Sequence, residues 1–184
     1  MADVYYSEPL GPFAPAIGNN FNTFATKQDV SPLPLAIIQG NRLRPGAILK
    51  LEAEGEWGAT GTPTFVLGFY CGIPGASGGG TITTTFAESS AFTASAITGI
   101  PWRMEYRGKV VTIGTAGSIV GSGDIEWGTS LTAFTGAPIP ITLALRTVAL
   151  NTTVANAIGV CATCSVSNAA NNVRVYGISA VLLN

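Results

Sequence analysis

The chain has 184 residues, of which 47% are hydrophobic and only 10% are charged, and its nine Lys and Arg against ten Asp and Glu give a formal net charge of −1. This length predicts one domain with a sizeable core, and the many aliphatic and aromatic residues exclude a disordered chain. The basic residues are scattered rather than gathered in a stripe, so no direct nucleic-acid partner is expected. No run approaches the roughly 20 apolar residues of a membrane helix, so no membrane partner is expected either.

The low charge has two interpretations. A soluble monomer normally carries more surface charge than this, so the composition favours a subunit that is partly covered in an assembly. A surface rich in Thr, Ser and Gly would also solvate a β-protein. The first ten residues carry acidic side chains and no apolar run, which predicts synthesis in a cytoplasm without a secretory signal.

Residues 1–18 are predicted to form an extended arm. Proline recurs at a spacing of three, which favours a polyproline-like path without internal hydrogen bonds. Such an arm lies on its own body or on a neighbour, unless it frays as many termini do. The apolar residues it carries favour a docked arm, and the proposed anchors are Tyr5, Tyr6, Leu10, Phe13 and Ile17.

Residues 19–184 are predicted to form a single β-domain, whose first strands cover residues 19–26 and 35–38. The clearest element is a hairpin over residues 46–72. In its first strand, apolar and charged residues alternate with a period of two, which indicates a half-buried antiparallel strand. One face carries Leu49, Leu51, Ala53 and Trp57, and the other carries Lys50, Glu52, Glu54 and Glu56.

The second strand of this hairpin, residues 64–71, is apolar or aromatic on both faces. Such a strand is buried on both sides of a sheet, or it is buried against a neighbouring subunit. We assign the subunit-facing role to one of its two faces, either Phe65, Leu67 and Phe69 or Val66 and Tyr70.

The remaining chain continues as short strands with Gly, Pro and Asn between them. Residues 72–80 are predicted as a flexible loop, residues 131–140 as a connection, and Gly108 as a strand break. Further strands are expected at 81–96, 102–107, 109–114, 118–128, 141–150, 157–166 and 173–183. Eight to ten strands without a convincing helix predict an all-β fold, and the irregular connections favour a jelly-roll or Greek-key β-sandwich.

The residue inventory restricts the chemistry. The chain has no histidine, so it cannot build a Ser-His-Asp or Cys-His arrangement or a facial-triad metal site. Cys161 and Cys164 form a C-x-x-C pair without a second pair, and on a strand two residues three apart face opposite sides. These thiols, with Cys71, are interpreted as small buried hydrophobes. No catalytic, cofactor-binding or metal-ligating residue is assigned.

Two acidic pairs were considered as sites. Glu52 and Glu54 lie about 7 Å apart on one strand face, within the reach of a paired-carboxylate hydrolase, but a solvated strand face explains them better. Asp124 and Glu126, near Trp127, alternate onto one face of their own strand and would be able to touch a sugar or a cation. A surface strand next to a core tryptophan explains them equally well.

Three stretches carry a family resemblance. The segment NRLRPGAILKLEAEGEW, followed by LGFYCG, resembles the polar turn and GxxxxxxAxGxW/F strand of jelly-roll domains in virion proteins of tailed bacteriophages. The run WRMEYRGKVVTIGTAGSIVGSGDIEWGTS and the ending VRVYGISAVLLN are similar to the same family. The resemblance covers residues 19–184 and implies a TNF-like jelly roll whose final strand runs through the middle of a sheet.

The resemblance implies a non-enzymatic virion component without cofactors, made in the host cytoplasm and assembled as a homotrimer. The leading expectation is a capsid decoration, or cement, protein on the outer capsid surface, whose arm binds the major capsid protein. The alternative is a receptor- or glycan-binding knob of a tail or fibre, with Trp127 and Phe134 lining a sugar site. A hydrolase that uses Glu52 and Glu54 is the third hypothesis.

Overall fold

The computed structural model describes most of the chain. For two short N-terminal segments, residues 7–9 and 21–22, it describes the backbone. The other described ranges are 26–32, 35–75, 80–130, 132–140 and 146–183.

Within these ranges the backbone forms strands and no α-helix, so none of the described segments is a helix that could cross a membrane. Eight of the strands have six residues or more, as the sequence predicted. The strands are β1 (Ser7–Pro9), β2 (Phe21–Asn22), β3 (Gln28–Asp29), β4 (Ala36–Ile38), β5 (Ile48–Gly58), β6 (Thr64–Pro74), β7 (Gly80–Glu88), β8 (Phe92–Thr93), β9 (Ile100–Thr112), β10 (Ser118–Gly128), β11 (Phe134–Ile139), β12 (Thr147–Ala149), β13 (Asn156–Cys164) and β14 (Asn172–Leu183).

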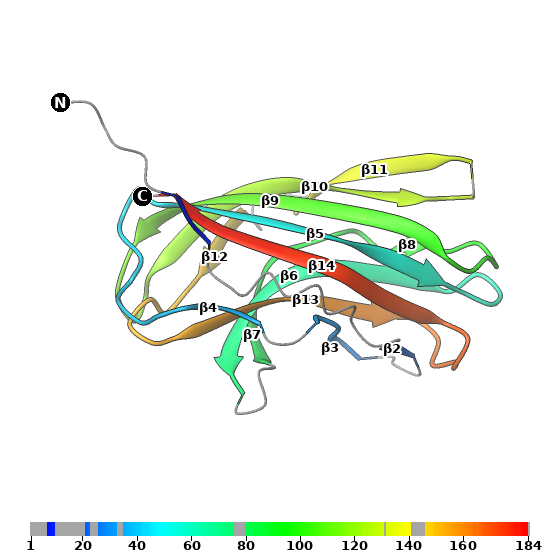
Figure 1. Ribbon diagram of the computed structural model, residues 1–184, viewed down its shortest axis with the longest axis horizontal. Coiled ribbons are helices and arrows are strands. Elements are labelled where there is room, and N and C mark those ends of the chain that lie inside the picture. The colour runs from blue at the N-terminus through cyan, green and yellow to red at the C-terminus, as the bar shows by residue number, and fades with distance from the viewer. Residues whose placement is uncertain are drawn as a thin grey trace.

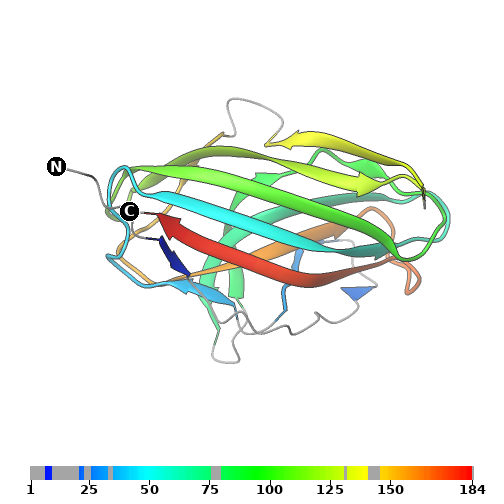
Figure 2. The ribbon, with the colours of Figure 1, turned by 45° about the horizontal axis from the view of Figure 1, so that its top comes forward.

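The strands form two antiparallel sheets that face each other as a β-sandwich (Figure 1). In sheet A the order is β1-β14-β5-β9-β10-β11, and its long strands lie side by side in Figure 2. In sheet B the order is β3-β13-β6-β7. Pairing is nested along the chain: β1 and β2 pair with β14, β3 and β4 with β13, β5 with β9, and β6 with β7. This nested pairing is a jelly roll, so the predicted fold class is confirmed.

The alternation seen in the sequence matches the burial of the strands. In β5, Leu49, Leu51 and Trp57 are buried while Lys50 and Glu54 are exposed. In β9, all even-numbered residues from 100 to 110 are buried and the odd-numbered ones are exposed. The charged sides of both strands therefore lie on the outer face of sheet A.

An aromatic cluster joins the two sheets inside the core. Trp57 of β5 lies 5.8 Å from Phe65 of β6 and 6.4 Å from Phe92 of β8, measured between ring centroids. Phe92 in turn stacks on Trp127 of β10 at 4.5 Å. Because these rings come from both sheets, they hold the sandwich together at this end by apolar burial and ring–ring contact.

The structure corrects the prediction of a subunit-facing strand. Strand β6 lies between β13 and β7. One of its faces enters the core, where Phe65, Leu67 and Phe69 are fully buried. On its other face Tyr70 is also fully buried within the same chain, and Val66 is half-buried. The two-sided apolar pattern is therefore explained inside one chain.

The covering of Tyr70 has a local cause. Its ring packs in a small cluster with Leu35, Ala157, Cys161 and the half-buried Ile82, on the outer face of sheet B. Leu35, directly before β4, supplies part of this apolar cover. No second subunit is needed to keep water from this aromatic ring.

Two further strand predictions are wrong. Strand β9 runs without a break through Gly108, which pairs with Leu49 of β5 and Gly121 of β10. A Cβ at this position would lie 2.7 Å from both Ile119 and the Tyr106 ring. The glycine is thus a packing residue and not a breaker. Residues 131–140 were expected as a connection, but β11 pairs with β10 over six residues and extends sheet A.

Other predictions concern residues that lie partly or wholly outside the described ranges. Strand β6 extends into the expected loop as far as Pro74, and residues 76–79 lie outside the described residues, as do residues 141–145. The five arm anchors also lie outside them. Within the predicted arm, residues 7–9 form β1, which pairs with the outer edge of the chain's own β14.

The three cysteines are buried and free of disulfides, as expected. Cys164 faces the main core, whereas Cys161 joins the Tyr70 cluster on the opposite side of β13. The C-x-x-C pair therefore diverges, as its position on a strand predicts. Burial raises the pKa of the Cys71 thiol to about 11 and that of Cys161 to about 12.

These thiols predict a loss of stability at alkaline pH. Above the ordinary thiol pKa the unfolded chain loses protons that the folded chain keeps, so stability falls by up to about 1.4 kcal/mol per pH unit for each thiol. We expect the free energy of unfolding in urea to change little between about pH 6 and 8 and to fall from about pH 9 to 11. The Cys71→Ala/Cys161→Ala variant should show a shallower fall. An unchanged slope would contradict the assignment to these thiols.

Candidate functional site

The outer face of sheet A gathers most of the charge of the chain. Six of the nine basic residues lie on it: Lys50, Arg103, Arg107, Lys109, Arg146 and Arg174. Six of the ten acidic residues lie there too: Glu52, Glu54, Glu56, Glu105, Asp124 and Glu126. In a chain with so few charges, this concentration marks the face as the principal polar surface among the described residues.

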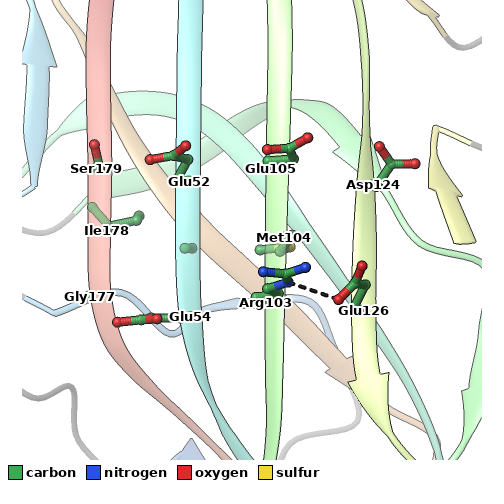
Figure 3. Close-up of a pocket in the computed structure, with 11 residues that line it drawn as sticks. Glu52, Glu54, Arg103, Met104, Glu105, Asp124, Glu126, Gly177, Ile178 and Ser179 are labelled. Atoms are coloured by element: carbon green, nitrogen blue, oxygen red, sulfur yellow. Dashed lines mark hydrogen bonds and ion pairs between the residues drawn. The ribbon is translucent and has the colours of Figure 1, made fainter. Parts of the chain in front are cut away.

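The strand register sets these side chains in rows across four strands. Directly paired positions place Ser179, Glu52, Glu105 and Asp124 in one row, as Figure 3 shows. The next row along the strands contains Gly177, Glu54, Arg103 and Glu126.

A shallow groove of about 550 Å³ runs over these two rows. Its walls are the charged side chains (Figure 3), and its lining also includes Ala53, Met104 and Ile178, whose side chains pack in or against the core beneath the sheet. Gly177 at the bulge of β14 adds no side chain, which opens the groove on that side. The arrangement is an open, acidic surface.

Ion pairs tie part of this face together. Arg103 Nε donates a hydrogen bond to Glu126 Oε2 at 2.8 Å. This bond lowers the pKa of the Glu126 carboxyl and raises that of the Arg103 guanidinium. Lys50 pairs with Glu52 on its own strand. Both pairs are well exposed, so each contributes little to stability.

The predicted carboxylate pair of a hydrolase lies in this groove. Glu52 and Glu54 come from the same face of β5 and line the groove together. Both are open to solvent, with 46% of the Glu52 side chain exposed, and the described residues contain no group of three His, Cys, Asp or Glu side chains placed to hold a metal ion. The geometry is that of a solvated strand face.

The aromatic residues proposed for a sugar site are not together. Trp127 is 8% exposed and stacks on Phe92 in the core, so its role as a sugar-lining residue is a prediction that the structure corrects. Phe134 is 60% exposed at the start of β11. Asp124 and Glu126 do share the outer face of β10, and no aromatic ring stands beside them in the groove.

Sequence reasoning missed the extent of this face. It identified the acidic row of β5 and the charged side of residues 103–107, but it treated them separately. Only the pairing of β5 with β9 and of β9 with β10 brings Glu52, Glu105 and Asp124 into line. The alternation of charged residues in each strand was the available signal, and it does not reveal which strands are neighbours.

Comparisons with known proteins add little to this geometry. No protein-family model and no curated protein sequence matches the chain. Among solved structures, it is similar to a peanut lectin with a 9mer peptide, at 7% identity and a TM-score of 0.33, over 98% of this chain and 97% of the lectin chain. A likeness of this size carries no argument about function.

Proposed function

We propose that this protein is a non-catalytic structural component of a tailed-phage virion. In this proposal it is a decoration protein that binds the major capsid protein on the outer surface of the shell and stabilises it. The proposal rests on the resemblance of three stretches of the sequence to jelly-roll virion proteins and on their placement in the fold.

One observation carries the proposal. The resembling stretches map onto β5 and part of β6, onto β9 with β10, and onto β14. Four of these strands are consecutive neighbours in sheet A, in the order β14-β5-β9-β10, whereas β6 lies in sheet B. Segments far apart in the chain therefore form one continuous surface, which is also the surface that carries most of the charge. The final strand β14 lies inside this sheet, between β1 and β5, as the resemblance implies.

In this proposal the arm extends from the edge of sheet A. Strands β1 and β2 both pair with β14, at Val181–Leu183 and at Asn172–Val173. The N-terminal segment is thus anchored at the edge of sheet A, next to the charged face. The proposed capsid contacts are Tyr5, Tyr6, Leu10, Phe13 and Ile17. A homotrimer stays a prediction, because the strand that suggested it is covered within one chain.

Removal of residues 1–18 tests the arm. We expect the truncated protein to stay folded, because the buried residues from Val30 onward form a core between the two sheets, although it loses the pairing of β1 with β14. Cosedimentation with shells assembled from the major capsid protein should be lost. Full binding by the truncated protein would rule out the arm as the capsid-binding element.

Counting copies per particle tests the proposal as a whole. Quantitative gel densitometry or image reconstruction of virions should show this protein on the shell, with a copy number per particle comparable with the number of capsomers. A handful of copies at the tail would instead support the receptor- or glycan-binding alternative. That alternative loses one of its two proposed aromatic contacts, because Trp127 lies in the core.

A further inference from the structure

The charges on the outer face of sheet A are sorted along the strand direction. One end, the basic half, carries four exposed or half-buried cations and no carboxylate: Lys50, Arg107, Lys109 and Arg146. The adjoining rows, the acidic half, carry five carboxylates and one guanidinium: Glu52, Glu54, Glu105, Asp124, Glu126 and Arg103. The basic half therefore has a formal charge of +4, and the acidic half has a formal charge of −4.

This sorting leaves several like charges directly opposite each other within a single chain. Like charges directly opposite each other on paired strands are destabilising, yet Glu52 faces Glu105, which faces Asp124. Lys50 likewise faces Arg107. Among the described residues, no ion pair joins Glu105, Asp124 or Arg107 to an opposite charge.

The pattern is self-complementary under a two-fold rotation. Neighbouring rows lie about 7 Å apart, since side chains on one face recur every second residue. Consider an axis that lies in the plane of the face, parallel to the rows, between the row of Lys50 and the row of Glu52. A rotation of 180° about it turns a second copy over and places its basic half above the acidic half of the first.

We propose that the outer face of sheet A binds the same face of a second copy of this chain, with the basic half of each copy on the acidic half of the other. Such an isologous contact is the commonest symmetry of soluble oligomers. It brings opposite charges of the second copy next to Glu105, Asp124 and Arg107, none of which forms an ion pair among the described residues.

The size of the face suits a small, weak interface. Four strands at about 4.8 Å and four rows at about 7 Å cover an area of roughly 500–550 Å², below the ~800 Å² that each partner buries in a standard interface. The contact is polar, so its strength depends on charge and falls as salt screens it. Equal and opposite halves give no net attraction for a polyanion or a polycation, which favours a second copy over either.

Sedimentation velocity of the full chain tests the contact at about 0.01 M and about 1 M salt, where the screening lengths are about 30 Å and 3 Å. We expect a dimer at low salt, in place of the homotrimer that the resemblance implies, and its Kd should rise at least tenfold at high salt. A monomer at low salt, or an oligomer that salt does not weaken, would overturn the proposal.

Two charge-reversed variants make the test specific. Lys50→Glu/Arg107→Glu brings the formal charge of the basic half from +4 to 0 and leaves the face acidic overall, and Glu52→Lys/Glu105→Lys brings the acidic half from −4 to 0 and leaves the face basic overall. Each should fail to self-associate, with Kd raised at least tenfold, while an equimolar mixture of the two should form a heterodimer. A matched control, Lys27→Glu/Arg44→Glu, changes the net charge as much as the first variant, and it should dimerise like the original chain, because Lys27 pairs with Glu88 of β7 and Arg44 lies in the turn before β5, outside the paired rows.

The outcomes are distinct. Self-association that survives either reversal, or a mixture that stays monomeric, would show that this face is not the contact. Circular dichroism of each variant confirms the β-fold before the comparison. The result is independent of the capsid-binding assay, because the oligomeric state is measured without shells.

Discussion

Replacement of Trp57 by alanine is expected to lower the free energy of unfolding by about 3–5 kcal/mol. The indole is 1% exposed and contacts Phe65 and Phe92 of the opposite sheet. Truncation removes this buried apolar area and leaves a cavity between the sheets. The rigid strands cannot move together to close this cavity. Urea denaturation followed by circular dichroism measures the loss.

Phe134→Ala is the matched control for this change. Phe134 is also a large aromatic residue, but it is 60% exposed on β11. Its removal should change stability by no more than about 0.5 kcal/mol. A small effect at Trp57, comparable with that at Phe134, would show that the aromatic cluster does not hold the two sheets together.

Gly123→Ala is expected to destabilise the fold by roughly 3 kcal/mol. A Cβ at Gly123 would lie 1.8 Å from the carbonyl oxygen of Glu105 and 2.6 Å from its carbonyl carbon. These are backbone atoms of the neighbouring strand, so β9 and β10 would have to separate where their register aligns the charged rows. Thermal and urea unfolding of the variant measure the effect.

Gly177→Ala in β14 provides the comparison on the same sheet. No atom lies within 4 Å of a Cβ at this position, so we expect unchanged or slightly higher stability, because alanine restricts the unfolded chain more than glycine does. Equal destabilisation at both glycines would indicate that sheet A needs glycine for conformational freedom rather than for close strand approach.

The sequence was most informative for strands that have one buried face and one solvent-exposed face. In β5 and β9, the alternation of large apolar and charged residues predicted the buried and exposed sides correctly. It was misleading where the environment comes from distant segments. The apolar outer face of β6 suggested a second subunit, but Leu35 and its neighbours cover Tyr70. Nothing in the local pattern of residues 64–71 shows whether a second subunit or a distant segment of the same chain buries this face.

Glycine was the second source of error. Gly108 reads as a strand break when only its conformational freedom is considered. In the structure it is a site of close approach, with Tyr106 and Ile119 in the space that a side chain would fill. Whether a glycine ends a strand or admits a neighbour depends on which strand lies beside it, and this pairing is not a local property.

The all-β class, the buried faces of the main strands, the absence of histidine chemistry and the divergence of Cys161 and Cys164 were predictable before the fold was known. Each of these follows from residue type or from a period of two along one strand. Long-range contacts were needed to show which strands are neighbours, that the chain covers both faces of β6, and that three carboxylates from three strands line up. These depend on long-range pairing between β5, β9 and β10, and a charge pattern within one strand carries no information about its partners across the sheet.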